Sequence, residues 1–494
     1  MQLIDGQERF KLAQSLHMGQ GVPQDLVTAE HLYHEILNHN LGNPMVLYTL
    51  GTLMLDTGRY GMALQLLSHV VNSVETFGEA WNALGLTFKA LNDYENADAA
   101  FEQAMEILPS DISDIPANRS AIRINNGTPQ EALDFANMAL EIEPDNLNCQ
   151  FNKALALLEL QQWEAWKWHE VRLNPDYRRA DNMRVDLRNY ADDGVTPAWD
   201  GSDVSTNMTI AVHGEQGLGD EIIFMSAFDC FRKLLPADTT YIVEPNPRLE
   251  QLFRRSWPDV NVFGTHNLNG EDWLGLPNPH GGVFERPNYK VAMGSLPRFT
   301  RLTDEDFPRK KFLELDEDKV KKMRALLPET GKLRVGIAWQ GGIHLTHVRL
   351  RSMHLLKLRS ILEKDVDWVS FQYTPDVGVE LDELKKATGI EPFHDPALVG
   401  AEADIDDTIH LAASCDLVIS VCQSVVHMCG GAGIPCWCLT PSKPAWRYGV
   451  NDKITMPWYG DWVRLVRQVG SDWDPVIKQV ADDLGALIET KVAA

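Results

Sequence analysis

A repeat with a period of 34 residues in the N-terminal part of the chain restricts its fold more than any other feature of the sequence. In residues 78–111, fixed positions hold either small or large apolar side chains: Trp81, Leu84, Gly85, Phe88, Ala97, Phe101, Ala104 and Pro109. Small residues such as Gly85 and Ala97 allow two helices to approach closely, while the large ones fill the space between them. The pattern therefore predicts a solenoid built from pairs of helices.

The same positions recur on both sides of this unit. One period earlier they hold Leu47, Leu50, Gly51, Met54, Ala63, Leu67 and Val70, and one period later, with one residue inserted, Ala132, Ala136, Ala139 and Pro144. The pattern resembles the tetratricopeptide repeat, which implies a solenoid over residues 1–175 that ends in an aromatic-rich helix from Gln161. Stacking alone explains each of these residues, so a spacer, a self-association arm and a binding surface for a protein partner are all open.

A buried strand–helix–strand unit is predicted near the C-terminus. Residues 417–421 form a short apolar run rich in β-branched side chains, typical of a strand buried on both faces, and residues 434–439 form the next strand. The helix between them should begin at Gln423 and Ser424 and end at the glycines Gly430, Gly431 and Gly433. Such a helix start offers unpaired N–H groups to a phosphate, although most turns of this kind bind nothing.

A second α/β region is predicted upstream of this unit. A strand at residues 208–212 runs into a glycine-rich turn, followed by a helix over residues 221–233. Gly217 and Gly219 would let a ligand approach the backbone, and Asp220 would lie at the start of the helix. From the residues alone, Asp220 is most simply a helix cap.

Basic and aromatic residues follow several strands of the C-terminal region. Arg349 and Arg351 come after a strand at residues 334–339 and could clamp a diphosphate bidentately, although a solvated loop would look the same. Lys443 and Arg447 could reach phosphates, and Trp446 could stack on a base or a sugar or simply anchor its loop.

Together these motifs resemble heptosyltransferase-like glycosyltransferases of the GT-B type that carry tetratricopeptide repeats. The motifs that carry the resemblance are Pro197-x-Trp199-x-Gly201, the turn from Glu215 to Asp220, Gly294-Ser295, Arg351-Ser352, Asp407-Thr408, and Ser424-x-x-His427 followed by Gly433-x-Pro435. The resemblance implies an α-solenoid followed by two Rossmann-like α/β domains. The expected boundaries are residues 1–175 for the repeats, 176–207 for a linker, 208–330 for the acceptor domain, and 331–494 for the nucleotide-sugar donor domain, whose last helix packs back on the first.

The resemblance also implies roles for individual residues in an inverting, metal-independent hexosyl- or heptosyltransferase without a cofactor. Asp220 would be the base that takes a proton from the acceptor hydroxyl. The diphosphate-binding residues would be Arg349, Arg351, Gln423, Ser424, His427, Lys443 and Arg447. Nucleotide or sugar contacts would come from Gln340, Gln372 and Trp446, and the acceptor-side loop would contain Gly217, Gly219 and Ser295. Cys422 and Gln423 stand where this family commonly has Asp-Thr.

Composition excludes some partners. The formal net charge of −25 argues against nucleic acid, because phosphates attract Lys and Arg. No apolar run approaches the length of a membrane span and no apolar signal region begins the chain, so we expect a cytoplasmic protein. The seven cysteines form no disulfide framework and are interpreted as small buried hydrophobes.

Two other functions are left open by the residues. A catalytically decayed tetratricopeptide interaction scaffold would fit the departure at Cys422 and Gln423, and a nucleotide-sugar epimerase or hydrolase would fit the same fold. The transferase is preferred because Asp220, Arg351, Ser424 and His427 occur together, which a decayed site would not require. Its partners would be a nucleotide-sugar donor and a protein or glycan acceptor.

Overall fold

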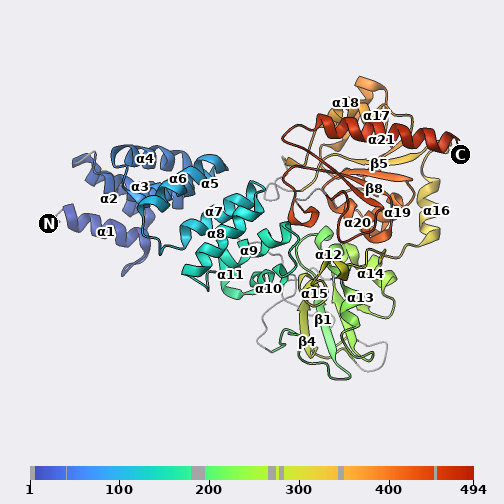
Figure 1. Cartoon of the computed structure of the whole chain (residues 1–494), viewed down its shortest axis with the longest axis horizontal. Helices are drawn as coiled ribbons and strands as arrows, with labels where there is room; N and C mark the ends of the chain where they lie inside the picture. The colour runs from blue at the N-terminus through green and yellow to red at the C-terminus, as the bar shows by residue number, and fades with distance from the viewer. Residues whose placement is uncertain are drawn as a thin grey trace. The chain divides into compact units, whose positions relative to one another are not determined.

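The computed structural model describes residues 6–39, 42–179, 195–264, 274–276, 283–342, 350–449 and 453–493. The chain divides into two compact units, Met1–Ala156 and Leu157–Ala494, whose elements are labelled in Figure 1. The first unit is helical and the second contains two parallel sheets.

Helices of the first unit pack as consecutive pairs, α1 with α2, α3 with α4, α5 with α6 and α7 with α8. Their bounds are α1 (Gly6–Met18), α2 (Leu26–His39), α3 (Pro44–Asp56), α4 (Tyr60–Ser73), α5 (Gly78–Ala90), α6 (Tyr94–Ile107), α7 (Asp114–Asn125) and α8 (Pro129–Ile142); α9 (Leu147–Glu159) spans the division between the units. Phe101 is fully buried, and a Cβ atom on Gly85 would lie 2.7 Å from its ring, so the small and large positions of the repeat meet as expected. The predicted helical solenoid is confirmed.

Three short helices follow α9 and belong to the second unit: α10 (Ala165–His169), η1 (Glu170–Leu173) and α11 (Pro175–Arg179). We call residues 161–173 the bridging segment. The sequence pattern assigned this segment to the end of the solenoid, whereas contacts group it with the α/β part of the chain.

The first sheet is parallel, with the strand order β3-β2-β1-β4. Its strands are β1 (Thr209–His213), β2 (Thr240–Glu244), β3 (Asn261–Val262) and β4 (Tyr289–Ala292), and its helices are α12 (Leu218–Met225), α13 (Phe228–Arg232), η2 (Pro247–Leu249), α14 (Glu250–Ser256), η3 (Met293–Ser295) and α15 (Leu296–Thr300). The prediction of a single helix over residues 221–233 is wrong, because the chain forms two separate helices there, α12 and α13. The Ser226 carbonyl accepts a hydrogen bond from Arg301 Nη2 at 2.7 Å instead of continuing the helical ladder.

The second sheet is also parallel, with the order β6-β5-β7-β8-β9. Its strands are β5 (Arg334–Ala338), β6 (Asp367–Ser370), β7 (Leu417–Val421), β8 (Cys436–Thr440) and β9 (Val463–Arg467). The remaining helices are η4 (Asp304–Asp306), α16 (Glu317–Ala325), η7 (Leu355–Leu358), α17 (Arg359–Leu362), α18 (Val377–Thr388), α19 (Ile405–Ala412), α20 (Ser424–Ala432), η8 (Trp446–Tyr448) and α21 (Asp474–Ala493). With the repeats, the two parallel-sheet domains form the predicted fold class, consistent with a GT-B-type pair.

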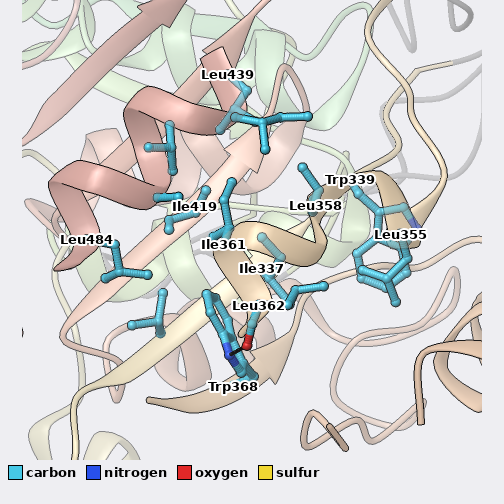
Figure 2. Packing of buried hydrophobic residues seen from close by; sticks show 14 of the residues in the cluster. Ile337, Trp339, Leu355, Leu358, Ile361, Leu362, Trp368, Ile419, Leu439 and Leu484 are labelled. Atoms are coloured by element: carbon cyan, nitrogen blue, oxygen red, sulfur yellow. Dashed lines mark hydrogen bonds between the residues drawn. The ribbon is translucent and has the colours of Figure 1, made fainter. Parts of the chain in front are cut away.

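The core of the second sheet explains where the last helix packs. Ile337, Ile419 and Leu439 from the strands meet Leu355 and Leu358 in one buried cluster, and Leu484 of α21 belongs to it (Figure 2). We expected the apolar stripe of α21 to return to the first α/β domain. It is instead buried against its own sheet, where neighbouring strands offer a continuous apolar face.

Two predicted helix ends also differ from the structure. Gly430 and Gly431 lie inside α20 rather than ending it. The Gly431 carbonyl, in the last turn, accepts hydrogen bonds from the backbone of Phe312 and Leu313 at 2.9 and 3.0 Å. A side chain on Gly431 would collide with Leu313, and only Gly433, with φ of +78°, ends the helix.

The cap of α19 is Asp404, whose carboxylate accepts from the Asp406 N–H at 2.9 Å. The sequence alone favours Asp407 for that role, because it directly precedes an expected helix over residues 408–414. This prediction is wrong, since α19 begins at Ile405 and Asp407 lies in its first turn, where it pairs with Lys319 at 2.6 Å.

Candidate functional site

Two helix N-termini meet in the second unit, and each follows the central strand of its sheet. Helix α12 begins shortly after β1, and α20 begins shortly after β7. The two helices contact each other, and a Cβ atom on Gly219 would lie 2.7 Å from Cδ2 of His427. Gly219 therefore allows the start of α12 to pack directly on α20, at the carboxyl ends of parallel strands where α/β proteins bind ligands.

Asp220 in the first turn of α12 has two separate partners. Its Oδ2 atom accepts a hydrogen bond from the Gly217 N–H at 3.1 Å. Asp220 is not the helix cap expected from the sequence, because α12 begins at Leu218 and Gly217 takes the capping position. Its Oδ1 atom pairs with Nε of Arg447, whose Nη2 donates to Oε1 of Gln216 at 3.2 Å. A partly buried carboxylate of the first α/β domain is thus joined to a guanidinium of the second.

The N-terminus of α20 has no side-chain cap from Gln423, the residue that precedes it. The Nε2 atom of Gln423 donates to Oγ of Ser420 at 3.3 Å. Arg351 lies directly in front of the helix, since its Nη1 donates to the carbonyl oxygen of Cys422 at 3.3 Å. Unpaired N–H groups, the positive end of the helix dipole and a guanidinium together suit a phosphate group. Arg349 lies outside the described residues.

Cys422 replaces the acidic residue common in the resembled family, and its side chain is buried. Its Sγ atom lies 3.8 Å from Sγ of Cys438, inside the packing between β7 and β8. The thiol is therefore a small buried group, as the sequence indicated.

His427 is enclosed by protein. Its Nδ1 and Nε2 atoms lie 3.1 and 3.2 Å from the hydroxyl oxygens of Tyr459 and Tyr448. Burial, reinforced by Arg447 and Arg351, lowers the pKa of His427 to about 3, so the ring is neutral at physiological pH. The His427 ring packs against Gly219 of α12 and supplies no positive charge to a ligand.

The two glutamines proposed to contact a nucleotide are occupied within the protein. Gln372 is buried, and its Oε1 accepts from the backbone N–H groups of Trp339 and Gln340 at 3.0 and 2.9 Å. The side-chain amide of Gln340 donates to Glu380. The Gln372 bonds fasten the ends of β5 and β6 to each other, and the Gln340 bond joins the end of β5 to α18.

Trp446 is also enclosed, because its ring lies 6.0 Å from that of Trp166, 5.9 Å from Trp458 and 6.3 Å from Phe224. The guanidinium of Arg447 lies over the Trp446 ring at 4.7 Å. This packing orients Arg447 toward Asp220. Lys443 is exposed on the loop that precedes them.

The acceptor-side serine is tied into a buried charge network that the sequence did not indicate. Oγ of Ser295 donates to Glu170 at 2.8 Å and accepts from Arg172 at 3.0 Å. Arg172 also pairs with Glu215, a residue of the glycine-rich motif to which we had assigned no role. Glu215 and Gln216 could have been singled out because they stand in that motif, whereas nothing in the sequence around Arg172 pointed to the site.

Among the residues that the structure describes, no group of three or more His, Cys, Asp or Glu side chains could hold a metal ion. Within the same residues, no helix is long and apolar enough to cross a membrane.

Comparisons with known proteins bear on the repeats and on most of the chain. Residues 78–111 match the model of the tetratricopeptide repeat. The chain is 27% identical over 437 residues to Protein FlbA of Caulobacter vibrioides, which covers 87% of this chain and 70% of that protein. Among solved structures, MamA aligns with 37% of this chain and 99% of its own at 19% identity and a TM-score of 0.30. The alignment with the tetratricopeptide protein TTC0263 of Thermus thermophilus covers 36% of this chain and 94% of that protein, also at 19% identity and a TM-score of 0.30.

Proposed function

We propose that this protein is a glycosyltransferase that moves a sugar from a nucleotide-activated donor to an acceptor hydroxyl. The observation that carries the proposal is the meeting of α12 and α20, which brings the Asp220 carboxylate close to an uncapped helix N-terminus flanked by Arg351. A transferase that ejects a diphosphate needs these two elements, a base for the incoming hydroxyl and positive potential for the leaving group.

In the proposed reaction the acceptor oxygen attacks the anomeric carbon while the bond from that carbon to the diphosphate oxygen breaks. Asp220 takes the hydroxyl proton, for which a carboxylate within hydrogen-bond reach suffices. Attack opposite to the leaving group inverts the anomeric centre. The step needs no metal ion, because the negative charge that develops on the diphosphate falls on the α20 N-terminus and on Arg351.

Arg447 connects the two halves of this proposal. In the described structure it pairs with Asp220, and its guanidinium is held over Trp446. A donor diphosphate at the start of α20 would compete with Asp220 for this guanidinium, since phosphate and carboxylate are both bidentate acceptors for arginine. Donor binding would thereby leave Oδ1 of Asp220 available to the acceptor hydroxyl. The repeats would recruit a protein acceptor or another protein partner.

Donor binding is tested first by thermal unfolding of the full chain with UDP, GDP and ADP and with their sugar derivatives. A ligand that binds only the folded state stabilises it by about 2.7 kcal/mol at a concentration of 100 times its Kd. We expect a clear shift with one nucleotide and at least a tenfold loss of affinity in Arg351→Ala, because a charge-assisted bond of about 1.5–3 kcal/mol is removed. Arg359→Ala is the control, since Arg359 is exposed and pairs only with Glu363 among the contacts described. A folded protein that binds none of these ligands would favour the interaction scaffold.

The base is tested with Asp220→Asn, which keeps the size and the acceptor atom of the side chain but cannot take a proton. We expect release of the nucleoside diphosphate from the donor to fall by about 10²- to 10⁴-fold with nucleotide binding retained. Asp238→Asn, at an exposed position in the same domain, should leave turnover unchanged. Full turnover in Asp220→Asn would exclude this base, and turnover of the donor that no acceptor accelerates would point to the hydrolase or epimerase.

A further inference from the structure

A fully buried arginine joins the bridging segment to both loops of the acceptor side. Arg172 lies in η1, and no part of its side chain is exposed. Its Nε and Nη2 atoms donate to the two carboxylate oxygens of Glu215 at 2.9 and 2.7 Å. Nη2 also donates to Oγ of Ser295 at 3.0 Å, so one side chain holds two loops that are far apart in the sequence.

The guanidinium of Arg172 has no donor to spare. Its Nη1 atom donates to the carbonyl oxygen of His169 and to Oε1 of Glu170, both at 2.9 Å, so each of its five N–H groups has an acceptor. Carboxylates on both sides hold the pKa of Arg172 above its ordinary value despite burial. A lysine has three donors on a single nitrogen and cannot reproduce this planar fork.

The partners of Arg172 lie beside the proposed acceptor site. Glu215 immediately precedes Gln216, which contacts Arg447, and Gly217, whose N–H donates to Asp220. Oε1 of Glu215 also accepts from the Gly294 N–H at 2.6 Å. A Cβ atom on Gly294 would collide with this carboxylate and lie 2.9 Å from Nη2 of Arg172, so the loop at Gly294 is built around the ion pair.

Aromatic packing fixes the bridging segment where Arg172 needs it. Trp163 stacks on Trp166 with ring centroids 6.3 Å apart, and Trp163 Nε1 donates to Asp304 at 2.7 Å. Trp166 also contacts Trp446 and Trp458 of the second α/β domain, with ring centroids 6.0 Å apart in both pairs. The segment therefore touches the Trp446–Arg447 loop through Trp166 and the acceptor loops through Arg172.

We propose that Arg172 is a positioning residue for the acceptor side of the site, acting through Glu215 on the glycine-rich turn and through Ser295 on the second loop. This inference rests on the proposed function for its catalytic consequence. Its structural part, the fixing of both loops by one side chain of the bridging segment, stands independently. The bridging segment is accordingly a component of the catalytic unit.

The test compares Arg172→Lys with the unaltered full chain by hydrogen exchange and mass spectrometry. Because the lysine cannot hold both loops, we expect the peptides covering residues 213–220 and 293–300 to exchange about tenfold faster or more. The peptide covering α20 should exchange at its original rate. With a nucleotide sugar identified by thermal shift, nucleotide affinity should stay within about twofold while turnover falls about tenfold or more, since only the acceptor side is displaced.

A matched control is available in the repeats. Arg119 is buried, and its Nε and Nη2 atoms donate to Oδ1 and Oδ2 of Asp98 at 2.8 and 3.2 Å. Arg119→Met therefore also removes a buried arginine–carboxylate pair. It should leave both loop peptides and donor turnover unchanged. If Arg172→Lys fails to fold, Ser295→Ala removes one contact and should accelerate exchange at residues 293–300 while leaving residues 213–220 unaffected.

Three results would overturn the inference. Unchanged exchange of both loop peptides in Arg172→Lys would exclude the positioning role. If the α20 peptide exchanged faster by the same factor as the loop peptides, Arg172 would stabilise the whole unit and would have no specific positioning role. Unchanged exchange at residues 293–300 in Ser295→Ala would break the link to the second loop. If the unaltered protein binds no nucleotide, the proposed function fails, and the exchange data still decide whether Arg172 fixes the loops.

Discussion

At the scale of single residues, Glu159 is a carboxyl group buried at the end of α9 with one oxygen that lacks a hydrogen-bond partner. Its side chain is 6% exposed, and Oε2 is the atom without a partner. Burial raises the pKa of Glu159 to about 8, because the charged form has lost its water and gained no counter-charge in exchange. The folded protein therefore holds a proton that the unfolded chain releases at lower pH.

The sign of the resulting pH dependence follows from this difference. Between the ordinary glutamate pKa of about 4.3 and a value near 8 the folded state binds more protons than the unfolded state, so stability falls as pH rises. The loss is about 1.4 kcal/mol for each pKa unit, several kcal/mol in total. We expect Glu159→Gln to be more stable than the unaltered protein at pH 8 and similar to it near pH 4.5, measured by denaturant unfolding. Glu141→Gln, at an exposed position on α8, should show no such difference, and a gain that is equal at both pH values would contradict the assignment.

At the scale of elements, contacts of glycine determine how closely helices pack. A Cβ atom on Gly85 of α5 would lie 2.7 Å from the Phe101 ring of α6, whereas a Cβ atom on Gly61 of α4 would have no other atom within 4 Å. Both glycines are helical, Gly61 in the first turn of α4 and Gly85 in the interior of α5. They differ mainly in what an added methyl group would meet, so the pair separates packing from helix propensity.

We expect Gly85→Ala to destabilise the repeats by up to about 2 kcal/mol. Alanine gains up to about 1 kcal/mol of helix propensity, but the collision with Phe101 costs about 1–3 kcal/mol. Gly61→Ala should instead be neutral or stabilising by up to about 1 kcal/mol. Thermal or denaturant unfolding of the two variants measures the difference, and equal stability would mean that α5 and α6 shift apart without loss.

At the scale of the whole molecule, the bridging segment belongs to the unit that contains both sheets. Two further groups of contacts join the α/β domains within that unit. Arg248 donates to the carbonyl oxygens of Ala403 and Gly400 at 2.9 and 3.3 Å, and Arg255 pairs with Asp406. The pairing of Asp220 with Arg447 lies in a third group, where the proposed ligand would bind. Among these described contacts, the pairing of Asp220 with Arg447 is the one that we expect a diphosphate to break.

Local patterns in the sequence were sufficient for the repeats and for most strands. The spacing of Gly85, Ala97 and Phe101 reports helix pairs, because small and large positions must alternate at each helix crossing. β7 has the bounds expected from its apolar run. The start of α20 was also predictable, since a helix N-terminus depends on a few neighbouring residues. The start of α12 was not, because the helix begins at Leu218 and includes Asp220, which we expected to precede it.

Contacts between distant segments were decided only by the tertiary structure. Nothing in the sequence around Arg172 marks it as a partner of Glu215, and only the fold makes the two residues a buried pair. The sequence likewise offered Trp446, Gln340 and Gln372 to a ligand, while packing occupies them within the protein. The helix broken at Ser226 follows from a carbonyl taken by Arg301, 75 residues away. Local propensity carries no information about such partners, because burial and hydrogen bonding across the fold outweigh it.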